Sequence, residues 1–355
     1  MNQTIRRLHS SFLRSLNNLT SLSDIRVLRK KTRLLMKAVD RRTRPARSRT
    51  IPTGIEVSKS FLLGELEQIQ RSQTLERAHY YLARLHKALT SVKTAKANDL
   101  NLRRWKQYTE VLTDSLWILP KRDSSGNHSA WYWGNFVPQI PYQLMTRYTK
   151  KGEWVLDPFA GSGTTLLECQ RLQRNGLGIE LNPSVARKTQ SVLERANPSG
   201  RVRTEIEIGD STKSNFRNLL KKRGVHSVQL AILHPPYHDI IRFSKNRRDL
   251  SNASSVDRFT ELFGLVVDHV LEVLDKNRFF AVVIGDKYDR KEWIPLGFRL
   301  MDEVLKRDCR LKSIVVKNFE QTAGKRKLQA LWRYRAMAGG FYVFKHEYIF
   351  IFQKK

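Results

Sequence analysis

The sequence predicts an α/β fold, in which a seven-stranded sheet carries helices on both faces and ends in an antiparallel strand, together with an N-terminal helical domain. Three observations lead to this prediction. Strand and helix patterns alternate beyond His128, apolar residues keep helical spacing between Val57 and Leu119, and a tight Gly-Ser-Gly turn at 161–163 follows a short apolar run. Such alternation is typical of a largely parallel sheet.

The composition of this 355-residue chain favours a nucleic-acid partner. Its formal net charge is +32, far beyond what solubility requires, and a surplus of this size usually serves a polyanion. An anionic membrane surface competes, but no apolar run approaches the ~20 residues of a spanning helix, and the N-terminus lacks a signal-peptide pattern. Cys169 and Cys309 suggest neither disulfides nor zinc. We therefore expect a cytoplasmic protein with no membrane partner and no metal.

Two segments precede the alternating region. Residues 1–52 are strongly basic, and we expect either a solvated, partly disordered tail or an arm that grips phosphates. Residues 53–127 form the predicted helical domain. Apolar residues keep to one helical face over 75–89 and again over 102–116, and Pro120 ends the second helix.

Residues 128–355 contain the predicted sheet. Helical patterns separate the first six strands, whereas no obvious crossover helix lies between the last two, so we expect that pair to be antiparallel. The expected strands are 154–157, 178–181, 202–208, 228–234, 279–286, 313–319 and 341–352. The expected helices are 164–173, 184–196, 212–222, 256–275 and 295–307.

A nucleotide-like cofactor is expected beyond the first of these strands. Asp157 ends that strand, where ligands bind in open parallel sheets. Gly161 and Gly163 let backbone amides and a helix N-terminus approach a ligand closely. Glu180 ends the next strand, where an acidic side chain can accept hydrogen bonds from two ribose hydroxyls. Leu166 stands where the dinucleotide fingerprint has a third glycine, and no Walker lysine is present, so nicotinamide and triphosphate ligands are disfavoured.

The next two strand ends carry further polar groups. Asp210 has two compatible interpretations, a helix N-cap and a contact to the edge of an adenine ring. The fourth strand ends in His234-Pro235-Pro236-Tyr237, where two prolines without N–H groups leave carbonyl oxygens free beside an aromatic ring. An aromatic amine is a poor nucleophile because its lone pair is delocalised, and acceptors for its N–H groups restore that lone pair. This strand end therefore predicts a site for an amine substrate.

Two motifs resemble those of the S-adenosylmethionine-dependent DNA methyltransferases that modify N6 of adenine or N4 of cytosine. They are Asp-Pro-Phe-Ala-Gly-Ser-Gly-Thr-Thr at 157–165 and Pro-Pro-Tyr at 235–237. The segment 134–141 resembles the family's segment against the cofactor methionine, and the resemblance covers roughly 128–355. It implies a Rossmann-like seven-stranded methyltransferase sheet, S-adenosylmethionine as cofactor and DNA as substrate, with the target base flipped out of the duplex. Restriction or other genome-defence proteins are the partner proteins that it suggests.

The resemblance also assigns site residues. His234 and the Pro235 carbonyl would contact the target amine, beside Pro236, and Tyr237 would stack on the base. The family usually has Asp, Asn or Ser where His234 stands. A neutral imidazole can accept the amine hydrogen bond and a protonated one cannot, so activity should fall as pH drops through the histidine pKa. The implied cofactor residues are Pro138, Ile140, Asp157, Phe159, Gly161, Ser162, Gly163, Thr164, Glu180 and Asp210.

Two basic segments border the predicted cleft, one after the Pro-Pro-Tyr motif and one between the last two strands. Their basic residues could neutralise phosphates while aromatic rings stack on bases. The expected nucleic-acid-binding residues are Arg242, Lys245, Arg247, Arg248, Lys325, Arg326, Lys327, Trp332, Arg333 and Arg335. Two alternatives remain beside DNA methylation. One is an RNA methyltransferase acting on a guanine amine, and the other is a DNA-binding relative that has lost catalysis.

Overall fold

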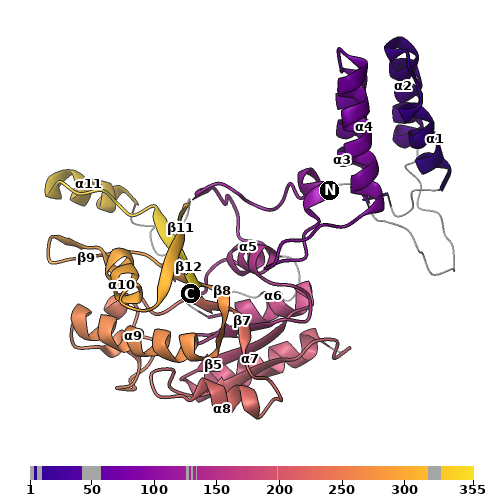
Figure 1. Ribbon diagram of the computed structural model, residues 1–355. Helices are drawn as coiled ribbons and strands as arrows, with labels where there is room; N and C mark the ends of the chain where they lie inside the picture. The colour runs from indigo at the N-terminus through magenta and orange to yellow at the C-terminus, as the bar shows by residue number, and fades with distance from the viewer. Residues whose placement is uncertain are drawn as a thin grey trace. The chain divides into compact units, whose positions relative to one another are not determined.

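The chain divides into two compact units (Figure 1). Unit 1 consists of Met1–Lys96 and Leu100–Val111, and unit 2 of Ala97–Asp99 and Leu112–Lys355. In the part of the chain that the structure describes, no helix has the length and apolar character needed to span a membrane. The computed structural model describes residues 4–5, 10–41, 57–124, 128, 131–132, 134–197, 199–318 and 329–355.

Unit 1 is a helical unit that includes much of the basic N-terminal segment. One apolar cluster joins Leu16 and Leu28 from that segment to Leu62 and Leu82 further on. This differs from the predicted boundary near residue 52, because the basic residues face solvent while the apolar ones between them pack inward. The elements are β1 (Thr4–Ile5), α1 (Ser10–Thr20), α2 (Ile25–Arg41), β2 (Val57–Ser58), α3 (Lys59–Gln70), α4 (Leu75–Thr90) and the 3₁₀ helix η1 (Leu102–Gln107).

The predicted helix over 102–116 is wrong beyond Gln107. Leu116–Trp117 instead form the short strand β3, which pairs in parallel with the strand containing Val316. Trp117 is only 2% exposed and belongs to the apolar cluster on one face of the sheet. Burial of this large ring outweighs the helical spacing of the local sequence.

Unit 2 is built on an eight-stranded sheet with the order β3-β11-β12-β8-β7-β4-β5-β6. Figure 1 labels β11, β12, β8, β7 and β5 of this sheet. β12 runs antiparallel to both β8 and β11, and the other neighbours are parallel. The predicted Rossmann-like sheet with an antiparallel final strand is therefore confirmed, and β3 adds an eighth strand to the expected seven. The remaining strands are β4 (Trp154–Asp157), β5 (Asn175–Glu180), β6 (Thr204–Ile208), β7 (Val228–Leu233), β8 (Leu274–Ile284), β11 (Cys309–Asn318) and β12 (His346–Lys354).

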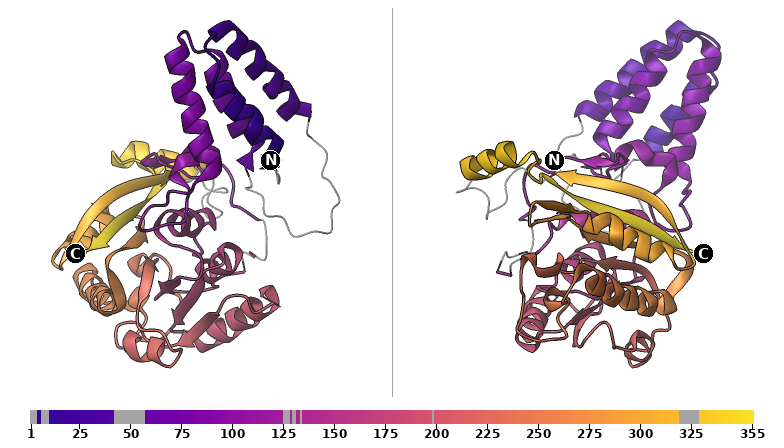
Figure 2. Two further views of the ribbon diagram at one scale, coloured as in Figure 1. Left: turned by 45° about the vertical axis from the view of Figure 1, so that its right-hand side comes forward. Right: turned by 90° about the vertical axis from the view of Figure 1, so that its left-hand side faces the viewer.

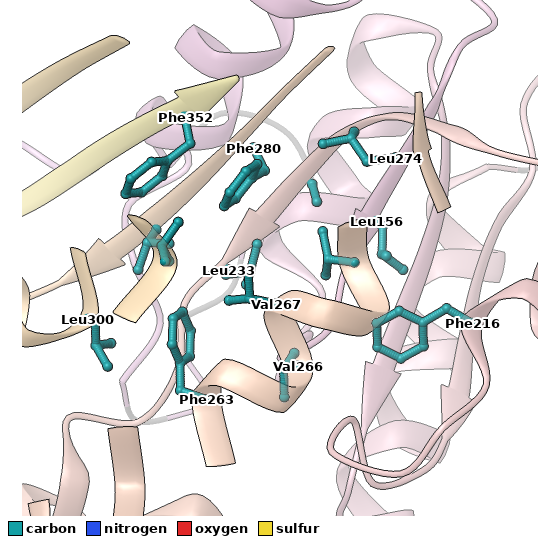
Figure 3. Packing of buried hydrophobic residues seen from close by; sticks show 14 of the residues in the cluster. Leu156, Phe216, Leu233, Phe263, Val266, Val267, Leu274, Phe280, Leu300 and Phe352 are labelled. Atoms are coloured by element: carbon teal, nitrogen blue, oxygen red, sulfur yellow. The ribbon is translucent and has the colours of Figure 1, made fainter. Parts of the chain in front are cut away.

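Helices cover both faces of this sheet. On one face, Phe263 and Val267 of one helix pack against Leu233 and Phe280 of the central strands (Figure 3). On the other face, Ile140 packs with the alternate residues of the same strands. The parts of these central strands that are buried on both faces, 230–233 and 280–284, are apolar runs, which is why their pattern was readable. The helices are α5 (Gln139–Tyr148), α6 (Thr164–Leu172), α7 (Pro183–Ala196), α8 (Phe216–Lys221), α9 (Val256–Val273) and α10 (Leu296–Leu305).

The connection between β11 and β12 contains a helix that the sequence did not predict. It is α11 (Gln329–Gly339), which extends away from the sheet in Figure 1 and in the right-hand view of Figure 2. No side chain that the structure describes in α11 is buried, and without an apolar stripe the helix gives little periodic signal. The smaller elements of unit 2 are β9 (Lys287–Asp289), β10 (Glu292–Ile294) and the 3₁₀ helices η2 (His238–Ile240) and η3 (Leu250–Asn252).

Candidate active site

A cleft of about 1020 Å³ lies beyond the carboxyl ends of β4, β5 and β7. β4 lies between β7 and β5, so the chain that leaves β4 continues the sheet on one side with β5 and β6 and on the other side with β7 and β8. This reversal of strand order is where open α/β sheets bind ligands. The cleft is lined by residues from every motif that the sequence singled out, among them Gly161, Glu180, Asp210 and His234.

The turn between β4 and α6 depends on two glycines. Gly161 and Gly163 have φ of +49° and +77°, a region that side chains rarely adopt. A Cβ on Gly163 would lie 2.6 Å from Cγ2 of Thr189, and one on Gly161 would lie 3.1 Å from the Tyr132 ring. The Thr189 hydroxyl also donates to the Gly161 carbonyl oxygen at 2.9 Å. The turn thus lies close against α7 and presents bare backbone to the cleft.

The Glu180 side chain is held by two backbone amides, one from the glycine turn after β4 and one from the segment after β5. Its carboxylate accepts hydrogen bonds from the amides of Gly161 at 3.0 Å and Asn182 at 2.8 Å. Burial raises the pKa of this carboxyl, the two amides lower it, and the nearby Asp249 carboxylate raises it. Each carboxylate oxygen keeps lone pairs beyond these bonds, so Glu180 can still accept hydrogen bonds from ligand hydroxyls.

Asp157 lies behind the cleft wall and does not line it. Its side chain is buried, and Oδ1 accepts a hydrogen bond from the Phe159 amide at 2.9 Å. Burial raises the pKa of Asp157 to about 6. Its contribution is to shape the turn through this bond, which places Phe159 on the cleft.

Of the other predicted cofactor residues, some line the cleft and others lie in the core or in the elements behind it. Thr164 lines the cleft, whereas Ser162 does not. Ile140 is fully buried in the sheet core, and Pro138 directly precedes α5. The two residues before Pro138, Phe136 and Val137, line the cleft in their place.

Asp210 lines the cleft and has one carboxylate oxygen without a hydrogen-bond partner in the described part of the chain. Its Oδ1 accepts hydrogen bonds from the amide and the hydroxyl of Thr212, at 3.0 and 2.7 Å. Its Oδ2 is buried and has no hydrogen-bond partner among the described residues. The N-cap interpretation is wrong, because Asn215 caps α8 and Asp210 begins a separate turn. A buried carboxylate oxygen without a donor fits an exocyclic amine of a bound nucleoside.

His234 stands at the end of β7, half-buried on the cleft. Its ring lies edge-on to Phe136 and Tyr237, with centroid separations of 4.8 and 5.7 Å. Burial lowers the pKa of His234 to about 4; Glu347 opposes this shift and Lys317 adds to it. The imidazole is therefore neutral at neutral pH, as an acceptor for an amine must be.

Sequence reasoning missed the ion pair beneath His234. Lys317 of β11 and Glu347 of β12 lie directly opposite in the ladder, with Nζ 3.0 Å from Oε1. Both side chains are buried. The available signal was Glu347 itself, a carboxylate directly before the apolar and aromatic run 348–352, because such a group is buried only with a partner.

The cleft rim also contains an aromatic pair that the sequence analysis did not assign. Tyr132 stacks on Phe243, with ring centroids 5.8 Å apart and an interplanar angle of 19°. A Cβ on Gly134 would lie 2.8 Å from the Phe243 ring, so a bare backbone is needed beneath it. Burial raises the pKa of Tyr132, and Glu180 and Asp249 raise it further.

The predicted nucleic-acid-binding residues fall into three groups. Arg242, Lys245, Arg247 and Arg248 are exposed on the loop after the Pro-Pro-Tyr motif, and of these Arg248 lines the cleft. Trp332, Arg333 and Arg335 lie on α11, where the Arg335 guanidinium is 5.4 Å from the centre of the Trp332 ring. Lys325, Arg326 and Lys327 lie outside the described residues.

The chain is similar to a family model, to curated proteins and to solved structures. A family model described as DNA methylase matches residues 65–191. The Type II methyltransferase M.MjaII of Methanocaldococcus jannaschii is 25% identical over 193 residues, which cover 52% of this chain and 36% of that protein. The Type II methyltransferase M.XycI of Xanthomonas campestris pv. cyanopsidis is 35% identical over 83 residues, or 23% of this chain and 26% of that protein. Among solved structures, TrmN from Thermus thermophilus has a TM-score of 0.40 and 17% identity, covering 63% of this chain and 50% of that chain.

The resemblance to the adenine-N6 and cytosine-N4 DNA methyltransferases is confirmed. S-adenosylmethionine is the methyl donor of this family, and Glu180, Asp210 and the glycine turn fit it. The family match begins within α3, upstream of the stretch that carried the sequence resemblance, and ends within α7, before His234. The aligned stretches span about a third or less of these two curated relatives.

Proposed function

We propose that the chain transfers a methyl group from S-adenosylmethionine to the exocyclic amine of adenine (N6) or cytosine (N4) in DNA. One observation carries the proposal. The acidic wall of Glu180 and Asp210 and the His234–Tyr237 segment line the same cleft, so a methyl donor and an amine can meet there. The DNA methylase match and the Type II methyltransferase relatives favour DNA as the substrate.

The chain's own residues account for binding at the donor end. Bound S-adenosylmethionine supplies an electrophilic methyl group on a sulfonium sulfur. Glu180 would accept hydrogen bonds from the ribose hydroxyls, and Oδ2 of Asp210 would accept one from the adenine amine of the donor. The glycine turn lets the backbone approach without steric conflict.

At the acceptor end, the amine nitrogen needs its lone pair directed at the methyl carbon. His234 and the carbonyl oxygen of Pro235 each accept one amine N–H, which draws the lone pair out of conjugation with the ring. S-adenosylmethionine would supply the methyl group, and these two acceptors would aim the nitrogen lone pair at it, with one amine proton lost to solvent. Positioning of this kind is the main contribution that a single displacement requires from the protein.

A paired and stacked base cannot reach this cleft, so base flipping is part of the proposal. Arg248 lines the cleft, and the exposed Arg242, Lys245 and Arg247 lie on the same loop, so these four residues would contact phosphates on either side of the flipped nucleotide. Genome-defence proteins, including a restriction nuclease, are the partner class consistent with the Type II relatives.

Incubation with methyl-labelled S-adenosylmethionine and either DNA or bulk RNA tests the function directly. We expect label in DNA, and nucleoside analysis of the product would give the modified base. His234→Ala should abolish labelling, while His226→Ala, at an exposed position on the loop before β7, should retain it. Label in RNA alone would show that the substrate assignment is wrong, and DNA binding without label would favour a relative that has lost catalysis.

A further inference from the structure

The hydroxyl of Tyr237 connects His234 to the buried ion pair. It donates a hydrogen bond to Oε2 of Glu347 at 2.8 Å, and Oε1 of the same carboxylate is 3.0 Å from Nζ of Lys317. The Tyr237 ring packs on Gly285, where a Cβ would lie 2.9 Å from ring carbon Cε2. Both the ring and its hydroxyl are therefore held in one place.

The direction of these hydrogen bonds is set by chemistry. Glu347 pairs with Lys317, and a carboxylate can only accept, so the single hydroxyl hydrogen of Tyr237 points at Glu347. Burial and Glu347 raise the pKa of Tyr237, which keeps that hydrogen in place. The lone pairs of the hydroxyl oxygen are left facing His234, whose Nε2 lies 3.4 Å away.

A neutral imidazole has one N–H and one acceptor nitrogen. An oxygen that offers lone pairs to Nε2 favours the tautomer with the proton on Nε2, because the other tautomer would bring two lone pairs together. At 3.4 Å the contact is long for a hydrogen bond, so it biases the tautomer more than it strengthens the fold. Within the described residues no hydrogen-bond partner occupies Nδ1 of His234.

We propose that Glu347 is a positioning residue: through Tyr237 it holds His234 as the Nε2–H tautomer and leaves Nδ1 to accept the target amine. This inference rests on the proposed function, since it names the nitrogen that serves that site. It also gives the buried ion pair a role, because such a pair contributes little net stability compared with apolar residues of similar volume. The Asp, Asn or Ser usual at this position needs no partner to set a tautomer, because its side-chain oxygen can always accept a hydrogen bond.

The test reverses the hydrogen-bond direction. In the Lys317→Met, Glu347→Gln double variant, the glutamine amide can donate to the Tyr237 oxygen, which frees the tyrosine hydrogen for Nε2. The proton of His234 then moves to Nδ1. Both charges are removed together so that no unpaired buried charge is left. Two-bond ¹H–¹⁵N correlation spectra of the histidine-labelled full chain report the tautomer, and His234→Asn identifies the His234 signals.

We expect Nε2–H in the unmodified protein and a shift toward Nδ1–H in the double variant, with kcat falling at least about tenfold and the KM for S-adenosylmethionine unchanged. The same double variant built on His234→Asn should change kcat by less than about twofold, because an amide oxygen needs no tautomer. A purely structural role would give equal losses in both backgrounds and would overturn the proposal. So would an unchanged His234 tautomer.

The tautomer measurement needs neither donor nor DNA. Absence of methyl transfer by the unmodified protein would therefore contradict the proposed function, while the spectra would still decide whether Glu347 controls His234. Thermal unfolding of each variant shows whether it is folded, so loss of structure is distinguished from loss of the tautomer.

Discussion

His234 determines how activity should respond to acid. Its lowered pKa of about 4 keeps the ring neutral well below the usual histidine range, although Glu347 opposes this shift and Lys317 adds to it. At saturating donor we expect kcat to fall only as pH drops through about 4, the pKa at which the ring gains a proton and ceases to accept. The kcat profile of His234→Asn, whose amide does not titrate, should lack this limb. A limb near the ordinary histidine pKa of ~6.5 would contradict the burial argument.

Asp157 should make the protein less stable at neutral pH than an uncharged side chain would. Its raised pKa, about 6, means that the folded chain binds more protons than the unfolded chain between about pH 4 and 6. The contribution of this group to stability therefore falls as pH rises through that window. Asp157→Asn, which keeps the acceptor for Phe159, should raise the free energy of unfolding at pH 7.5 by on the order of 1–3 kcal/mol.

Urea unfolding at pH 7.5 and pH 4 measures this difference. The gain should vanish at pH 4, where Asp157 is largely protonated in the folded chain. Asp302→Asn, at an exposed position on α10, is the matched control and should show no gain at either pH. Equal gains for Asp157→Asn at both pH values would mean that removal of charge is not the cause.

Two glycine substitutions separate the cost of a steric clash at the turn between β4 and α6 from the cost of a left-handed backbone conformation. Gly163→Ala adds a Cβ that would lie 2.6 Å from Thr189, at φ of +77°. Gly224→Ala adds a Cβ at φ of +71° with nothing within 4 Å, so it carries the conformational cost alone. That cost is about 1–2 kcal/mol. We expect Gly163→Ala to lose more stability and to weaken S-adenosylmethionine binding in calorimetry, while Gly224→Ala leaves the affinity unchanged.

The helix α11 should contribute to DNA affinity through charge. Arg333 and Arg335 are exposed, and the stretch 329–345 contains no acidic residue. Arg333→Gln with Arg335→Gln should reduce the slope of log affinity against log salt by about 1–2. Replacing Lys221 and Lys222, at the C-terminal end of α8, the helix that follows the edge strand β6, should leave the slope unchanged. Equal slopes for both pairs would place DNA elsewhere.

Elements buried on two faces were the predictable ones. β4, β7 and the second half of β8 contain apolar runs, and their positions fixed the strand ends on which the motifs stand. Segments shaped by one distant contact were not predictable. Trp117 makes β3 a strand through burial against the sheet, and the side chains described in α11 form no buried face that would give a period. The Lys317–Glu347 pair depends on the β11–β12 register, which no local pattern encodes.

At the scale of the whole molecule, the charge of +32 is shared between two units. In unit 1, α2 buries Leu28, Thr32 and Val39 and exposes basic residues between them, among them Lys30, Arg33 and Lys37. A folded helix with a basic solvent face differs from a loose tail, because its charges are held at fixed spacing and can contact successive phosphates. The two interpretations of this segment are a solvated surface and an arm that grips phosphates. They differ in whether the exposed basic face of α2 contacts DNA.

Lys30→Gln, Arg33→Gln and Lys37→Gln in the full chain address that question. All three residues are exposed on α2, away from the buried positions, so the fold should be retained. If α2 contacts phosphates, the slope of log DNA affinity against log salt should fall in magnitude by up to about 3. Each phosphate contact that is lost removes roughly one counterion from those released on binding. Calorimetric affinity for S-adenosylmethionine, which binds in unit 2, should stay the same. An unaltered slope would assign α2 to a solvated surface and leave the loop at 242–248 and α11 as the phosphate contacts.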